Sequence, residues 1–144
     1  MIRKMHKDEI EVVSNIWLNG NLTAHNFIDK NYWLKALATV KEQFQQADVY
    51  VFIDNNVIKG FVGVTDNYIA GIFVEETFRN QGIGQQLLNF LKQNYLKLSL
   101  DVYDKNIMAQ KLYLKNGFKI VSQDIEQDNN EKEYHMLWNQ GEDK

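Results

Sequence analysis

The sequence predicts one mixed α/β domain spanning residues 1–144, and three observations support this prediction. The chain has 144 residues, the usual length of one domain, and no linker, repeat or low-complexity stretch divides it. Hydrophobic residues make up 44% of the chain and aromatic residues 12%, which is enough for a packed core. The apolar periodicity changes in the order β-α-α-β-β-β-α-β-α-β-β, so we expect a mixed sheet of about seven strands with about four helices.

A short strand candidate at residues 2–5 comes before the first helical segment. Asp8 and Glu11 have the D-x-x-E spacing of a capping box at the start of that helix. The helix is predicted from apolar residues at helical intervals, namely Ile10, Val13, Ile16 and Trp17. The sequence Asn-Gly-Asn at residues 19–21 is expected to end it.

Two short features follow before the strands begin. Thr23 is expected to cap a short turn that holds His25 and Phe27. A second helix is predicted because apolar residues recur on one face, namely Trp33, Leu37, Val40 and Phe44. From Val49 onward the periodicity becomes that of strands.

The rest of the chain alternates strands with two further helices. Residues 49–53 and 57–64 form a predicted hairpin around Asp54–Asn56, and a third strand at 68–74 follows Asp66–Asn67. The remaining predicted elements are a helix at 81–94, a strand at 97–103, a helix at 106–116 closed by Gly117, and strands at 118–125 and 133–138 around a polar turn at 128–132.

Composition excludes several classes of function. A net charge of −3 and a pI of about 5.6 give no basic field, so neither nucleic acid nor a membrane is an expected partner. The absence of cysteine excludes disulfides, cysteine-ligated metal and any covalent intermediate on a cysteine. Three histidines without ligating spacing predict no metal site. The N-terminal segment lacks a signal-peptide pattern, which predicts a cytoplasmic protein.

The sequence Arg-Asn-Gln-Gly-Ile-Gly at residues 79–84 lies between a predicted strand and a predicted helix. The first amides of a helix lack intrahelical acceptors and the helix dipole is positive there, so this turn can bind an anion. Leu87 breaks the dinucleotide pattern G-x-G-x-x-G, and Gln85 stands where a nucleotide P-loop has lysine. A tight turn without a ligand is the alternative at this point.

Two motifs in the expected order resemble those of the GNAT N-acetyltransferases. Residues 79–84 are similar to the family's Arg/Gln-x-x-Gly-x-Gly/Ala motif, which binds the pyrophosphate of acetyl-coenzyme A. Residues 106–118, "NIMAQKLYLKNGF", are similar to its N-x-x-A-x-x-x-Y-x-K-x-G-F segment. The resemblance covers nearly the whole chain, is strongest from Ile69 to Phe118, and extends to small, poorly characterised bacterial members. It implies the GNAT fold with acetyl-CoA as cosubstrate, although Glu75-Glu76 replaces a proline common after the cofactor strand.

The resemblance also implies which residues contact the carrier. A bulge near Gly71 would free the amide of Ile72 for the acetyl carbonyl, and such a donor lowers the barrier by about 3 kcal/mol. Val74 would pair with the pantetheine arm, and Asn106 would either contact it or only cap its helix. The expected cofactor-binding residues are Ile72, Phe73, Val74, Arg79, Asn80, Gln81, Gly82, Ile83, Gly84, Gln85, Asn106, Ala109 and Tyr113.

The expected catalytic residues are Tyr113, Ile72 and His25. Tyr113 occupies the family's tyrosine position and would protonate the leaving thiolate, whose thiol has a pKa of about 8.5 by analogy with cysteine. Its alternative role is that of an ordinary core tyrosine. An acceptor amine with a pKa of about 10.4 must lose a proton before it attacks. The candidates for the base are His25, Glu75, Asp101, Tyr103 or water, and a solvated loop is the alternative for His25.

These features together predict an N-acetyltransferase that moves acetyl from acetyl-CoA to a primary amine in a ternary complex. The acceptor is expected to be a small molecule or a peptide, and aromatic residues of the first two helices either form core or line its cleft, namely Trp17, Phe27, Tyr32 and Trp33. A non-catalytic acyl-CoA sensor is the main alternative, and a structural or protein-binding domain is the second. The sequence leaves open whether the protein is a monomer or a homodimer.

Overall fold

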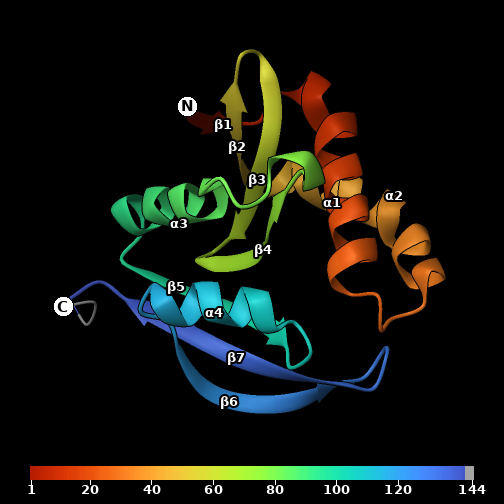
Figure 1. The fold of residues 1–144 in the computed structure, drawn as a ribbon, viewed down its shortest axis with the longest axis vertical. Helices are drawn as coiled ribbons and strands as arrows, with labels where there is room; N and C mark the ends of the chain where they lie inside the picture. The colour runs from red at the N-terminus through yellow and green to blue at the C-terminus, as the bar shows by residue number, and fades with distance from the viewer. Residues whose placement is uncertain (142–144) are drawn as a thin grey trace.

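A seven-stranded mixed sheet organises residues 1–141, the part of the chain that the computed structural model describes (Figure 1). Its strands are β1 (Ile2–Lys4), β2 (Asp48–Asp54), β3 (Val57–Thr65), β4 (Tyr68–Val74), β5 (Lys97–Tyr103), β6 (Lys119–Glu126) and β7 (Glu131–Asn139). The helices are α1 (Ile10–Ala24), α2 (Lys30–Gln46), α3 (Ile83–Asn94) and α4 (Ile107–Lys115), with single 3₁₀ turns η1 (Lys7–Glu9) and η2 (Glu76–Phe78). The predicted fold class and the predicted order of elements are confirmed.

The sheet divides into two parts at β4 and β5. The strand order is β1-β2-β3-β4-β5-β7-β6, and only β4 and β5 run parallel as neighbours. These two strands pair through Tyr68 with Ser99 and Ile69 with Leu100, and no later pairs follow among the described residues. Beyond Ile69 the two strands therefore separate, and the sheet opens between them (Figure 1).

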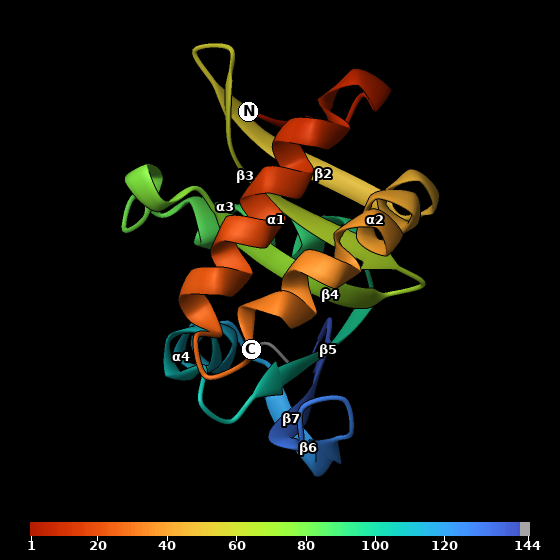
Figure 2. The ribbon, with the colours of Figure 1, turned by 90° about the vertical axis from the view of Figure 1, so that its right-hand side faces the viewer.

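Each face of the sheet has its own core. On one face, α3 and α4 pack on the middle of the sheet, with Leu87, Leu88, Leu100 and Met136 almost fully buried. On the other face, α1 and α2 cover β2, β3 and β4, and neither helix covers β6 and β7 (Figure 2). None of the helices within residues 1–141 is both long enough and apolar enough to cross a membrane.

The start of α1 differs from the prediction. The chain is already helical at Lys7, so the capping interaction joins the His6 amide to Glu9 Oε1 at 2.7 Å, and the predicted pair of Asp8 and Glu11 is wrong. Arg3 holds the Glu9 carboxylate through two hydrogen bonds of 2.9 and 2.7 Å, which lowers the pKa of Glu9 to about 2.

The predicted end of α1 at residues 19–21 is also wrong, because the helix continues to Ala24. Gly20 is buried against β4, where a Cβ atom would lie 2.6 Å from Cδ1 of Phe73. Asn21 donates its side-chain amide to the carbonyl of Trp17, one helical turn earlier, at 3.0 Å. The glycine is therefore needed for close packing, and Thr23 lies inside the helix instead of capping a turn.

The predicted turns are confirmed by their backbone angles. Asn55 and Asn56, between β2 and β3, have φ of 52° and 62°, which suits a tight hairpin turn. Gly117 follows α4 with φ of 89°, and the Phe118 amide donates to the carbonyl of Tyr113 at 3.1 Å. This is the glycine-closed helix end that the sequence predicted.

Candidate active site

The edge of β4 that faces β5 is open where the two strands separate. The pairing of β4 with β3 shifts between Gly71 and Ile69, so Ala70 has no partner and forms the bulge, one residue before the predicted Gly71. After the bulge, Ile72, Phe73 and Val74 remain paired with β3 on one side only. These three predicted cofactor-binding residues therefore present their other backbone edge to the gap.

The side chain of Phe73 points away from this gap. Its ring packs with the core beneath α1 and α2 and stacks on Phe61, with ring centroids 5.4 Å apart. Gly20 and Gly71 both lie against the ring, and a Cβ at either position would overlap it. Any contact of Phe73 with a carrier in the gap would therefore be made by its backbone.

The glycine turn forms the start of α3. Gly82 is the N-cap residue with φ of 80°, a conformation that side chains other than glycine rarely adopt, and nothing lies within 4 Å of a Cβ placed there. The first helical hydrogen bond runs from the Gln86 amide to the Gly82 carbonyl at 3.0 Å. The amides of Ile83, Gly84 and Gln85 therefore have no helical acceptor, as at any helix start.

This turn fits an anionic phosphate. Amides without a helical acceptor and the positive end of the helix dipole lie at this turn, and Gly82 adds no side chain beside them. Asn80 also has a left-handed backbone, with φ of 64°, which helps to reverse the chain before α3. Gln81 is exposed in the same turn.

The side chains of Arg79, in the motif, and Gln85, just after it, form hydrogen bonds with other residues of the protein. Arg79 donates Nε to the carbonyl of Val74 at 3.3 Å, which holds the turn against the end of β4. Gln85 exchanges two hydrogen bonds with the buried side chain of Asn116, at 2.5 and 3.0 Å. Gln85 thus joins α3 to the end of α4, and its available group at the turn is the backbone amide.

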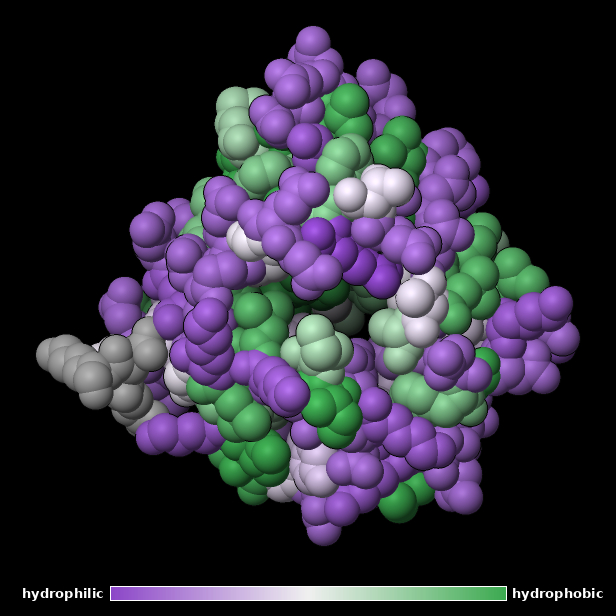
Figure 3. All heavy atoms as spheres, viewed as in Figure 1, coloured by the Kyte–Doolittle hydropathy of each residue, from purple (hydrophilic) through white to green (hydrophobic). Residues whose placement is uncertain are grey.

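Figure 3 shows that this face of the molecule is hollowed near its centre. In the same view of Figure 1, β4 passes there between the turn before α3 and helix α4. The hollow is bordered by both hydrophilic and hydrophobic residues. The open edge of β4, the glycine turn and α4 therefore surround one depression in the surface.

Tyr113 lies on α4 in the core beside this depression. Its side chain is buried, with its ring 5.7 Å from that of Phe118, and burial raises the pKa of the phenol to about 12. Its hydroxyl makes no hydrogen bond to another residue in the described part of the chain. The group is thus a protonated phenol at neutral pH. Ala109 is on the same helix, one turn earlier, and its amide is capped by Asn106 Oδ1 at 3.3 Å.

His25 is held between two asparagines. Its Nδ1 lies 2.8 Å from Asn21 Oδ1, and its Nε2 lies 3.0 Å from Asn106 Nδ2. The side-chain nitrogen of Asn21 donates to Trp17 O, so its Oδ1 is the atom that accepts from His25. The Oδ1 of Asn106 accepts from the Ala109 amide, so its Nδ2 donates to His25. His25 therefore carries its proton on Nδ1 and accepts at Nε2.

The surroundings of His25 keep it neutral. Its ring stacks on Trp33 with centroids 5.5 Å apart, and the ring of Tyr103 lies 5.0 Å away. Burial lowers the pKa of His25 to about 4. The alternative of a solvated loop is therefore wrong, and both ring nitrogens are occupied in this state, so a proton can reach Nε2 only after Asn106 moves.

The other predicted bases lie in different settings. Tyr103 donates its hydroxyl to Glu126 at 2.7 Å, and burial together with that carboxylate raises the pKa of the phenol well above its ordinary value. Asp101, on the same face of β5, accepts from the Tyr68 hydroxyl at 2.8 Å. Glu75 follows β4, where its amide donates to Lys59 O at 2.8 Å.

The sequence interpretation missed the residues that face Asp101 from β7. His135 pairs with Asp101 across the two strands, and its Nδ1 is hydrogen-bonded to Asp101 Oδ1. The potential ligand atoms of Asp101, Glu133 and His135 lie within 4.8 Å of one another, and those of His6, Asp8 and Glu9 form a second such group. Strand alternation predicts that His135 lies on the other face of β7 from the buried Met136. The spacing along the sequence does not show which strand pairs with β7, so the contact with Asp101 could not be predicted. The expectation of no metal stays a prediction.

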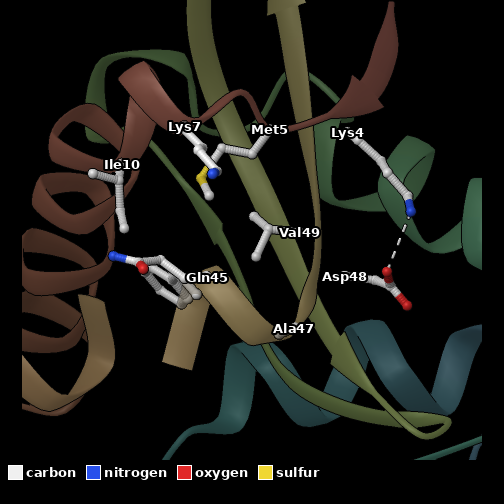
Figure 4. Close-up of a pocket in the computed structure, with 9 residues that line it drawn as sticks. Lys4, Met5, Lys7, Ile10, Gln45, Ala47, Asp48 and Val49 are labelled. Carbon is white, nitrogen blue, oxygen red and sulfur yellow. Dashed lines mark ion pairs between the residues drawn. The ribbon is translucent and has the colours of Figure 1, made fainter. Parts of the chain in front are cut away.

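A separate pocket of about 270 Å³ lies between the start of β2, the start of α1 and the end of α2 (Figure 4). Met5, Ile10, Phe44 and Val49 contribute its apolar walls. Lys4 and Asp48 form an ion pair of 3.4 Å at its rim. None of the predicted site residues lines this pocket.

Comparison with known proteins identifies the class to which this fold and this glycine turn belong. The model of the acetyltransferase (GNAT) domain matches residues 45–120. The chain is 31% identical over 123 residues to the peptidyl-lysine N-acetyltransferase YiaC of Escherichia coli, covering 84% of each chain. The chain therefore belongs to the GNAT acetyltransferase family.

Solved structures show the same fold at lower identity. The solution structure of apo YjaB from Escherichia coli matches with a TM-score of 0.84 at 20% identity, covering 96% of both chains. The PaiA N-acetyltransferase of Thermoplasma acidophilum, solved in complex with coenzyme A, matches with a TM-score of 0.79 at 16% identity, covering 96% of this chain and 98% of that one.

Proposed function

We propose that this chain transfers an acetyl group from acetyl-CoA to a primary amine by direct attack in a ternary complex, and that the amine is a lysine side chain of a peptide or protein. The observation that carries the proposal is the glycine N-cap of α3, with φ of 80° at Gly82, placed beside the open edge of β4. The peptidyl-lysine activity in the name of the 31% identical relative supports the choice of acceptor.

The residues present fit the carrier. Acetyl-CoA supplies an acetyl group activated as a thioester, together with phosphates that need an anion site. The amides of residues 83–85 would hold the phosphates, and the unpaired backbone edge of Ile72 to Val74 would orient the rest of the chain. The amide of Ile72 is the candidate donor to the acetyl oxygen.

Tyr113 would supply the proton for the departing sulfur. Burial raises its pKa to about 12, so the phenol stays protonated at neutral pH and its hydroxyl is free of protein partners among the described residues. The nitrogen–carbon bond forms as the carbon–sulfur bond breaks, and the phenol recovers its proton from the attacking nitrogen. The reaction yields an amide and a free thiol.

The connection between α1 and α2 would form the wall beside the acceptor. Tyr32 donates its hydroxyl to Asp128 at 3.0 Å, which ties α2 to the hairpin between β6 and β7. The rings of His25, Phe27 and Tyr103 contact one another with centroids 5.0 to 5.7 Å apart. Such a cluster can pack on the aliphatic stem of a lysine.

The proposal is tested by thiol release from acetyl-CoA with a panel of lysine peptides and small amines, together with calorimetry of coenzyme A binding. Wild type should release thiol, and Tyr113→Phe should lower kcat by about 100-fold with an unchanged Kd for coenzyme A. Tyr95→Phe is the matched control, since its hydroxyl lies 3.1 Å from that of Tyr50 and outside the site.

Two results would contradict the proposal in different ways. Tight binding of coenzyme A without thiol release from any amine would favour the non-catalytic sensor. No heat of binding at all would reject both readings and favour a structural or protein-binding domain.

A further inference from the structure

The face of β5 and β7 opposite α3 and α4 carries polar residues at the level where the sheet opens. Asp101 is the first residue of β5 after its last pair with β4, which is Leu100 with Ile69. Tyr103, two residues later on the same face, contacts His25 and Phe27 of the α1–α2 connection. This face therefore looks toward the proposed acceptor wall, while Leu100 and Val102 point into the other core.

A hydrogen-bonded row crosses this face from β4 to β7. Tyr68 donates its hydroxyl to Asp101 Oδ2 at 2.8 Å, and His135 Nδ1 is bonded to Asp101 Oδ1. A carboxylate only accepts, so the neutral imidazole carries its proton on Nδ1 and has a lone pair on Nε2. Nε2 of His135 makes no hydrogen bond within the described chain, and the side chain is 36% exposed.

We propose that His135 is the general base of the reaction and that Asp101 is the residue that positions it. This inference rests on the proposed function. Nε2 of His135 takes one proton from the ammonium of the acceptor, which leaves a neutral amine with the lone pair needed for attack, and passes that proton to solvent. Imidazole is the side chain whose ordinary charge change lies nearest neutrality, which suits this task.

The geometry favours His135 over His25, Asp101 and Tyr103. Both nitrogens of His25 are occupied by Asn21 and Asn106, and each carboxylate oxygen of Asp101 already accepts one hydrogen bond, from Tyr68 or from His135. The hydroxyl of Tyr103 is donated to Glu126. The pairing of a carboxylate with one imidazole nitrogen, leaving the other free, is the arrangement by which carboxylates orient catalytic histidines.

The first test compares His135→Asn with wild type in the thiol-release assay. The asparagine amide can still donate to Asp101 but has no group at the position of Nε2. We expect kcat to fall by about 100-fold or more, with the Kd for coenzyme A and the thermal midpoint close to those of wild type. His6→Asn, at the exposed residue just before turn η1, is the matched control and should keep full activity.

The second test is independent of activity. In free protein labelled with ¹⁵N-histidine, the neutral His135 ring should show a protonated Nδ1 and an unprotonated Nε2. In Asp101→Asn the amide oxygen should accept from Tyr68 and the amide nitrogen should face His135, so the proton should move to Nε2 and kcat should fall as well. The three histidines can be assigned by single substitutions.

Several results would overturn the inference. One is full kcat in His135→Asn, and another is an Nε2-protonated ring in wild type. A third is loss of activity on treatment with a chelator, with recovery on adding a divalent metal, because Asp101, Glu133 and His135 would then be ligands. If wild type itself releases no thiol, the proposed function fails together with this inference. If wild type releases thiol and His135→Asn has the same kcat, only the role of His135 is refuted and the proposed function stands.

Discussion

The two glycines of the turn before α3 should respond oppositely to the same substitution. Gly82 has φ of 80°, and placing alanine in this left-handed conformation costs roughly 1–2 kcal/mol. Gly84 lies in the first turn of α3, and its added Cβ would meet Leu112 Cδ2 at 3.5 Å, an ordinary contact. Alanine is favoured over glycine in a helix by about 0.5–1 kcal/mol. Gly82→Ala should therefore destabilise the protein, and Gly84→Ala should stabilise it.

Both substitutions should nevertheless weaken binding of coenzyme A. Each places a methyl group beside amides that are proposed to approach a phosphate, and a lost hydrogen bond to a charged group is worth about 1.5–3 kcal/mol. The Kd should rise by about 10-fold or more, since 1.4 kcal/mol corresponds to a factor of ten. For Gly84→Ala, higher stability would then accompany weaker binding.

Urea denaturation and calorimetry with coenzyme A measure the two quantities separately. Gln93→Ala, exposed on the same helix, is the control and should leave the Kd unchanged. A Gly84→Ala protein that binds coenzyme A as tightly as wild type would refute the proposed approach of phosphate to this backbone. A Gly82→Ala protein as stable as wild type would refute the argument from its conformation.

Three further predictions concern stability. Gly20→Ala should lower the free energy of unfolding in urea by about 1–2 kcal/mol, because overlap with Phe73 outweighs the gain in helix propensity. Burial lowers the pKa of His25 from 6.5 to about 4, so between these pH values the unfolded chain binds more protons than the folded one. The contribution of His25 to the free energy of unfolding should therefore be complete above pH 6.5 and should fall by up to about 3 kcal/mol toward pH 4. His25→Gln should remove this pH dependence. Gln85→Ala should lower the midpoint of thermal unfolding, because buried Asn116 Oδ1 loses its donor at a cost of about 1–3 kcal/mol. A midpoint equal to that of wild type would refute this role of Gln85.

Local chemistry made much of the fold predictable. Strand β5 was predicted with the bounds it has, Lys97–Tyr103, because its alternation is regular and turns bound it on both sides. The hairpin at Asn55–Asn56 and the glycine after α4 follow from the backbone angles that these residues tolerate. Gly20 led to the wrong prediction that α1 ends at residues 19–21. The glycine is required there by the ring of Phe73 in β4, which is more than fifty residues away along the chain.

The geometry of the candidate site could be predicted only where one continuous segment forms it. The turn at residues 79–84 can be recognised because an anion site at a helix start needs consecutive residues. The pairing of Asp101 with His135 joins two strands whose register depends on the whole sheet, so spacing in the sequence gives no sign of it. The contacts that engage His25 likewise come from α1 and from the start of α4, 81 residues away.

The ring of Phe73, held between Gly20 and Gly71, also sets the distance between helix α1 and strand β4. Gly20 belongs to the helix that leads into the proposed acceptor wall, and Gly71 belongs to the strand proposed to carry the thioester. The distance between α1 and β4 at this point is thus set by the width of one aromatic ring, whose opposite edges, at Cδ1 and Cε2, meet the two glycines. Exchanging that ring for a larger or smaller side chain offers a way to tune which amines enter, without altering any group that touches them.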